Sequence, residues 1–237
     1  VDGATVELGQ VNDITGSRFK VQQGAEFGSD IIADVYSSRT LGSSWTWDGG
    51  NWFRDLLVAE GTGAVLDLSS VGTVDSSFDD GTTEGRYHQI KATAGGSIDL
   101  SGVHTVITPV RGEDWVRFSV GGDLYLSSLR SIVRPVNGYG WAEFIVDVPN
   151  FSLPMLDSAE RTQFRLGTNS ALTLDSLAEM PAGAYFALSP GSHLNLPVLI
   201  SMQGIGDGSM VVPAGATLSM PSLERMNGVY LQVVDGA

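Results

Sequence analysis

Apolar residues recur along this chain in a nine-residue pattern, at intervals of two, three and three. The strings "LDLSSVGTV", "IDLSGVHTV", "LYLSSLRSI", "LTLDSLAEM", "LNLPVLISM" and "LSMPSLERM" share the pattern. In L-x-L the two apolar side chains lie on one face of an extended strand, and the longer interval that follows requires a bend. Each copy therefore predicts a short strand, a corner and a second short wall. Copies begin at Val6, Phe27, Leu66, Ile98, Leu124, Phe151, Leu172, Leu194 and Leu218.

A second apolar element of the form [FILM]-x-[VAL] accompanies the nonapeptide. A unit of about 21 residues with two such short strands cannot bury its apolar row alone, whereas stacked units close a continuous core. Residues rich in Gly, Ala, Ser, Asn or Pro then lead to the next copy. The second elements are Phe19/Val21, Leu56/Val58, Ile90/Ala92, Phe118/Val120, Phe144/Val146, Phe164/Leu166, Phe186/Leu188, Met210/Val212 and Leu231/Val233.

The repeat predicts an all-β fold, a single-stranded parallel β-helix (β-solenoid) of about nine coils. We expect one domain over residues 1–237, with irregular coils and Trp-rich and Asp-rich insertions in 1–97 and regular coils in 98–237. Pro154, Pro197 and Pro221 directly follow L-x-L, where a strand should end. A leucine-rich repeat is the main competing fold. It is disfavoured because its buried Asn is replaced here by Val or Leu.

Charge and composition limit the kinds of partner and location that we expect for this chain. Twenty-seven acidic and 13 basic residues give a net charge of −14, which repels phosphate backbones, so we expect no nucleic-acid partner. The sequence has no run of 18 apolar residues, and we expect no membrane span. The absence of cysteine excludes disulfides and thiolate metal sites. An acidic chain with two lysines suits secreted or salt-exposed proteins.

The strings "LDLSSVGTV", "IDLSGVHTV" and "LNLPVLISM", followed by "VRFSVGGD" or "YFALSPGSH", resemble the β-strand repeats of very large bacterial surface and adhesin-type proteins. Their rhythm is also similar to receptor L domains, another solenoid, although those carry cysteines that this chain lacks. The resemblance covers almost the whole chain, but the motif that carries it consists of core positions only. It implies an extracellular or cell-surface location and a structural or adhesive role, and it transfers no functional residues.

Aromatic residues mark the first half of the repeat. Phe53, Tyr87, Trp115 and Trp141 stand three places before the second element in four successive coils, and Arg161 follows in the fifth. Coils in register would stack them into a ladder beside a tryptophan-bearing insertion. Flat rings with carboxylates nearby suit a sugar-binding surface; alternatively, the rings anchor the long loops to the solenoid wall. The expected ligand-binding residues are Trp45, Trp47, Trp52, Tyr87, Trp115 and Trp141.

The string "DSSFDDGTTEGR" carries Asp75, Asp79, Asp80 and Glu84. Calcium prefers several oxygen ligands on a flexible loop, so these four are the candidate metal ligands. Their spacing does not match the EF-hand pattern, and a solvated acidic loop is the alternative. We expect no cofactor to be required, with calcium as the candidate ion.

Catalysis is the alternative to binding. A polysaccharide lyase would draw on His88, Lys91 and Arg86, and a hydrolase on two carboxylates such as Asp67 and Asp99. No histidine has an adjacent partner that indicates a triad or metal site, and the common nucleophile, phosphate and zinc motifs are missing.

The sequence therefore favours a non-catalytic structural or adhesive module that contacts a glycan or another surface protein. A polysaccharide-active lyase or hydrolase and a purely mechanical spacer of a longer array are the alternatives. The strings "VDGATVEL" and "LQVVDGA" resemble segments between coils, so we also expect end-to-end or neighbouring-domain stacking.

Overall fold

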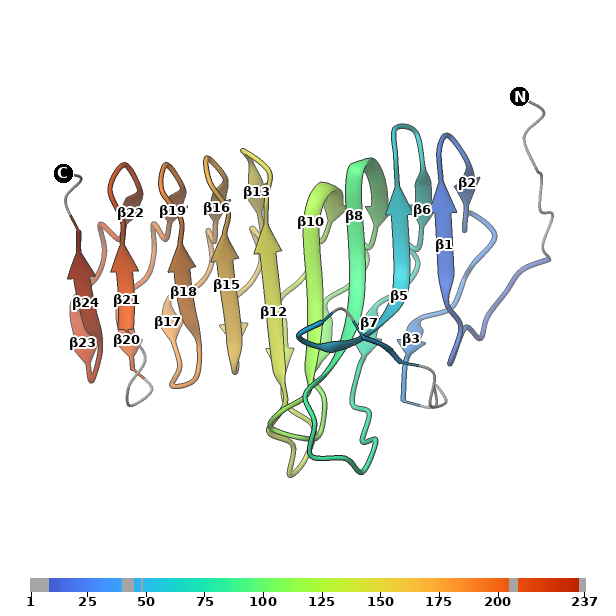
Figure 1. Cartoon of the computed structure of the whole chain (residues 1–237), viewed down its shortest axis with the longest axis horizontal. Helices are drawn as coiled ribbons and strands as arrows, with labels where there is room; N and C mark the ends of the chain where they lie inside the picture. Colours follow the sequence, from blue (N-terminus) through green and yellow to red (C-terminus); the bar gives the residue numbers. More distant parts are fainter. Residues whose placement is uncertain (1–8, 40–44, 48, 205–208, 235–237) are drawn as a thin grey trace.

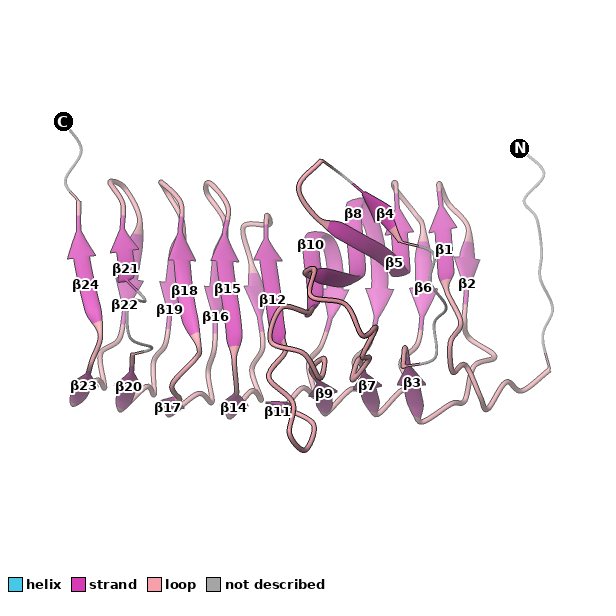
Figure 2. Ribbon diagram, turned by 60° about the horizontal axis from the view of Figure 1, so that its bottom comes forward, coloured by secondary structure: helices cyan, strands magenta, loops and turns pink. Residues whose placement is uncertain are grey.

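The computed structural model describes residues 9–39, 45–47, 49–204 and 209–234. These residues form strands and connecting loops, and no helix occurs among them. Successive coils wind side by side along one axis, with three strand-bearing faces (Figures 1 and 2). The predicted all-β parallel solenoid is confirmed.

The first face carries one strand from each coil, and its strands pair in parallel from β1 to β18. Nine such strands lie within the described residues, in agreement with the expected number of coils. They are β1 (Phe19–Gln22), β5 (Trp52–Glu60), β8 (Arg86–Asp99), β10 (Trp115–Tyr125), β12 (Trp141–Val146), β15 (Thr162–Leu166), β18 (Tyr185–Leu188), β21 (Ser209–Val212) and β24 (Tyr230–Val233).

The second face is formed by the L-x-L strands. The carboxyl-terminal parts of β8 and β10 turn the corner and take part in it. Its separate strands are β2 (Glu26–Phe27), β6 (Val65–Asp67), β13 (Phe151–Ser152), β16 (Ala171–Thr173), β19 (His193–Asn195) and β22 (Thr217–Ser219).

The third face follows the corner turn of each nonapeptide. It carries β3 (Val35–Ser37), β7 (Thr73–Asp75), β9 (Thr105–Ile107), β11 (Ser131–Val133), β14 (Ser158–Ala159), β17 (Glu179–Met180), β20 (Ser201–Gln203) and β23 (Arg225–Asn227). One short strand departs from this plan, because β4 (Thr46–Trp47) pairs antiparallel with β5.

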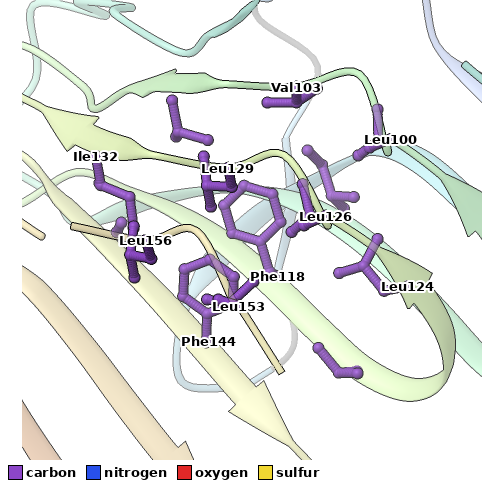
Figure 3. Close-up of a cluster of buried hydrophobic side chains, with 14 of the residues drawn as sticks. Leu100, Val103, Phe118, Leu124, Leu126, Leu129, Ile132, Phe144, Leu153 and Leu156 are labelled. Atoms are coloured by element: carbon purple, nitrogen blue, oxygen red, sulfur yellow. The ribbon is translucent and has the colours of Figure 1, made fainter. Parts of the chain in front are cut away.

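The apolar repeat forms columns along the interior. The second leucine of L-x-L is at most 1% exposed in each of six coils, and Figure 3 shows Leu100, Leu126 and Leu153 from successive coils among the buried side chains. A parallel row of rings runs through Phe118, Phe144, Phe164 and Phe186, with neighbouring centroids 4.6–5.3 Å apart. Of the predicted starts, Val6 lies outside the described residues. The six leucines are Leu68, Leu100, Leu126, Leu153, Leu174 and Leu196.

The three-residue interval in the repeat is the span of a β-turn. The N–H of Leu129 donates to the carbonyl of Leu126 at 3.1 Å, and the N–H of Leu156 donates to that of Leu153 at 3.2 Å. Pro154 occupies the second position of its turn, where its fixed φ is favoured. The turn thus returns the sixth position of the nonapeptide to the interior.

One predicted element is displaced by a residue. The register of β5 shifts between Asp55 and Leu57, and Leu57 pairs with both Phe19 and Ile90. Leu57 and Ala59, rather than Leu56 and Val58, therefore continue the inward columns. The cause is a bulge, which inserts one extra residue into the strand and reverses the faces beyond it.

Long loops connect the third face to β5, β8, β10 and β12, and the last three of them project together below the strands in Figure 1. Backbone hydrogen bonds join the last three of them in coil order. The N–H of Val110 donates to the carbonyl of Phe78 at 3.2 Å, and the N–H of Tyr139 donates to the carbonyl of Val110 at 2.7 Å. The loops therefore extend the stacking of the coils.

Candidate functional site

The predicted aromatic ladder lies at the edge of the first face. Phe53, Tyr87, Trp115 and Trp141 are successive partners in the parallel pairing of β5, β8, β10 and β12. The guanidinium of Arg161 lies 4.1 Å from the centre of the Trp141 ring. The register expected for these five residues is confirmed, and we call them the aromatic row.

The rings of the aromatic row stack on one another. Tyr87 and Trp115 have centroids 5.8 Å apart at an interplanar angle of 10°, and Trp115 and Trp141 lie 5.2 Å apart at 18°. Because neighbours from both adjacent coils cover Trp115, it presents an edge to a ligand. The half-buried row is therefore a rigid border, and an open ring face must come from elsewhere on the loops.

The three tryptophans of the first insertion have different surroundings. Trp45 stacks on the ring of His88 at 5.2 Å, and the Arg54 guanidinium lies 4.4 Å from its centre. Trp52 is half-buried, with Arg86 at 5.0 Å. Trp47 is 51% exposed, beside Trp52 at 5.1 Å. Trp45 thus anchors the loop, whereas Trp47 has surface available for a ligand.

A charged group beside the aromatic row was not predicted. Glu143 is almost fully buried and forms ion pairs with Arg117 and with Arg165, the latter at 3.2 Å. Tyr185 packs edge-on to Trp141, and burial, together with the charge of Glu143, raises its pKa. The sequence did contain a signal for this ion pair. Arg117 and Glu143 stand two residues after Trp115 and Trp141, at the same outward position of adjacent coils.

The structure does not bring the lyase candidates together. His88 points inward and is 1% exposed, with Nδ1 3.0 Å from the Ser38 hydroxyl. Burial, reinforced by the charge of Arg54, lowers its pKa to about 3. Lys91 lies three residues along the same strand and faces outward. Arg86 is engaged by Asp80 and Glu84, each at 3.0 Å.

Asp67 and Asp99 are adjacent in register, as the repeat predicts. Each carboxylate accepts the N–H two residues further on, from Ser69 at 3.0 Å and from Ser101 at 2.8 Å. Both side chains therefore stabilise the corner that follows their strand.

The acidic calcium candidates face arginines. Asp75 lies 2.8 Å from Arg39, Asp79 lies 3.7 Å from Arg111, and Asp80 and Glu84 share Arg86. In the part of the chain that the structure describes, no group of three or more His, Cys, Asp or Glu side chains could hold a metal ion.

Asp114 is one of the carboxylates near the aromatic row, and the sequence did not predict its burial. Its side chain is fully buried, and its Oδ1 accepts the Arg86 N–H at 3.1 Å. Burial, with the nearby charge of Asp80, raises its pKa to about 7. In "GEDW" nothing distinguishes Asp114 from the exposed acids around it, because its burial depends on the loops of neighbouring coils.

Comparisons of the chain with protein-family models, curated proteins and solved structures find no significant match. Among the residues that the structure describes, no helix is long and apolar enough to cross a membrane.

Proposed function

We propose that this chain is a non-catalytic structural and adhesive module of an extracellular or cell-surface protein, and that it contacts a glycan through its aromatic loop face. The observation that carries the proposal is the in-register aromatic row, bordered by stacked loops and by the exposed ring of Trp47. On this face, aromatic and hydrogen-bonding side chains are held together.

Rigidity supports a binding role. The phenylalanine stack fixes the strands beneath the face, and the last three long loops are hydrogen-bonded to one another. A preorganised surface loses little conformational entropy when a ligand binds, which favours recognition.

The contacts of the catalytic candidates favour binding over turnover. His88 is enclosed between the rings of Trp45 and Phe78, and Asp67 and Asp99 hold corner turns. Asp114 has the raised pKa of a general acid, but it is fully buried, out of reach of a polysaccharide. We propose that the module requires no cofactor, and that its acidic loop is held by arginines rather than by a calcium ion.

The last described coil supports a second contact, with a stacked neighbour such as another copy or an adjoining domain. Met226 on β23 and Tyr230 and Val233 on β24 are 43%, 59% and 73% exposed, and they belong to the edge strands of this coil. An open strand edge with apolar neighbours pairs readily with another chain. Sedimentation velocity tests this: self-association that Val233→Lys reduces supports a stacking surface, and a monomer at every concentration argues against self-stacking.

Titration with neutral and acidic polysaccharides, followed by tryptophan fluorescence and by absorbance at 235 nm, tests the main proposal. We expect binding without turnover and at least a tenfold loss of affinity in Trp47→Ala, because the exposed ring supplies the apolar contact. Tyr230→Ala, an exposed ring on the last coil, is the matched control and should bind normally. Unsaturated products would indicate a lyase, and a silent panel would indicate a spacer.

A further inference from the structure

A backbone hydrogen bond repeats between coils of the second face. Among the described residues it is missing twice, from Ser29 to Asp67, where β2 and β6 still pair, and between the fourth and fifth coils, where no strand pairing remains. The N–H of Leu100 donates to the carbonyl of Tyr125 at 3.0 Å, and that of Leu153 donates to Thr173 at 3.1 Å. Equivalent bonds join Leu68 to Asp99, Leu174 to Asn195 and Leu196 to Ser219. Within residues 121–156, all of them described, the corresponding bond from Leu126 to Ser152 is missing, and no ladder joins β10 to β13.

The corners of the two coils that flank the interruption differ in length. Val120 and Val146 are partners on the first face, but three residues separate Val120 from Leu124, whereas four separate Val146 from Phe151. The next coil uses five, between Leu166 and Leu172. The corner of the fourth coil, which contains Gly121 and Gly122, is therefore the shortest of the three. The strand that follows it is not paired with β13.

The two unpaired edges border a groove of about 420 Å³, which we call the β10–β13 groove. Tyr125 is 50% exposed, and the nearly buried Leu124 and Phe151 add apolar surface. Asp123, Asn150 and Ser152 add a carboxylate, an amide and a hydroxyl. Leu126 and Ser152 also line the groove. Their N–H and carbonyl groups are not hydrogen-bonded to each other, whereas the equivalent groups of five other pairs of coils are.

The ends of the groove limit what it can hold. Pairing between the two coils persists on one side, where the Asp147 N–H donates to Val120 at 2.8 Å, and resumes on the other, where the Asp157 N–H donates to Arg130 at 2.9 Å. An extended peptide running along the strands would meet these closed ladders after a few residues. The space suits a compact ligand that enters from solvent.

We propose that the β10–β13 groove binds the terminal unit of a neutral glycan. The face of Tyr125 packs against the C–H side of the sugar, and Asp123, Asn150 and the two freed backbone groups pair with its hydroxyls. The carboxylate and the net charge of −14 disfavour acidic sugars. The proposal deepens the glycan-binding role on a separate surface, and it stands even if the aromatic loop face binds nothing.

Calorimetry and saturation-transfer NMR with neutral monosaccharides and their disaccharides test this assignment. Wild type should bind at least one of these sugars, and Tyr125→Ala should weaken that affinity at least tenfold while keeping its melting temperature, because the ring is half exposed. Ser152→Phe should abolish binding by filling the groove. Thr173→Phe, the same position one coil further, is the matched control and should bind as wild type does.

Variants distinguish the two proposed glycan-binding surfaces. Sugar binding that is lost in Tyr125→Ala and Ser152→Phe but kept in Trp47→Ala supports the groove. Binding that depends on Trp47 alone, no binding of any neutral sugar, or binding of extended peptides in place of sugars would overturn the groove assignment. Hydrogen exchange gives a readout independent of affinity, because the Leu126 amide should become protected when a sugar binds.

Discussion

At the scale of single residues, burial rather than residue type determines what the charged groups do. Glu143 and Asp114 are both buried, but Glu143 is paired with two arginines, whereas Asp114 has one backbone donor and the negative charge of Asp80 nearby. The first forms ion pairs, whereas burial raises the pKa of the second to about 7.

Asp114→Asn should make the protein more stable at pH 8. The folded pKa of about 7 lies above the ordinary aspartate value of 3.8, so Asp114 stabilises the fold at low pH, and that contribution is lost as pH rises from about 4 through 7. The asparagine keeps the acceptor for Arg86 N–H without the charge. We expect a gain of about 2 kcal/mol at pH 8, or roughly 4–8 °C in Tm, and little gain at pH 4.

Thermal unfolding of both proteins between pH 4 and pH 8 checks this. Asp123→Asn, an exposed acid, is the control and should shift Tm little at either pH. Equal Tm differences for Asp114→Asn at the two ends of the range would contradict the raised pKa.

The acidic residues beside Asp114 give a second prediction, about calcium. Since Asp80 and Glu84 already pair with Arg86, and Asp75 pairs with Arg39, calcium would have to displace these arginines. We expect millimolar calcium or a chelator to leave Tm unchanged within about a degree. A clear rise in Tm with calcium that is lost in Asp80→Asn would instead establish a site.

At the scale of elements, the inward-facing rings hold the coils together. Phe144 is fully buried between Phe118 and Phe164. Phe144→Ala should lower the free energy of unfolding by about 3–5 kcal/mol, because it removes a large side chain and leaves a cavity. Ile145→Ala, the outward neighbour on β12, should cost less than about 1.5 kcal/mol. Denaturant unfolding measures both, and similar losses would argue against an inward ring column.

The elements also show how far the sequence predicts the fold. Interior columns, corner prolines and the aromatic register follow from spacing alone, because side-chain direction alternates along a strand and a turn has a fixed span. The displaced Leu56/Val58 element was wrong because a bulge in β5 changes the face without changing the composition. The break between β10 and β13 was not predicted. The short corner "VGGD" is visible in the sequence, but it does not by itself mark a break, because the same strand still pairs with β8.

The candidate site was less predictable than the fold. The register of the aromatic row was predicted, since equivalent positions in successive coils lie side by side, whereas the binding roles of these residues and of Trp47 stay predictions. Arg117 and Glu143 were missed and the burial of Asp114 was not predicted, because both features come from packing between coils. Burial of Trp45 against His88 likewise depends on where the long loop folds back.

At the scale of the whole molecule, one interior supports two different surfaces. The stacked loops and aromatic row lie at one corner of the coils, and the β10–β13 groove interrupts another face. Both depend on the same condition, which is that equivalent residues of successive coils are spaced by one strand separation along a single axis.

Distances between spin labels test that condition most directly, and the cysteine-free chain allows labels to be placed at will. Lys20, Lys91, Arg165 and Ala187 lie in one row of the first face. At about 4.8 Å per coil, the pairs Lys91/Ala187, Lys20/Arg165 and Lys20/Ala187 should be about 19, 24 and 29 Å apart, although they are separated by very different lengths of chain. Distances that do not increase by one strand spacing per coil would contradict the stacked solenoid.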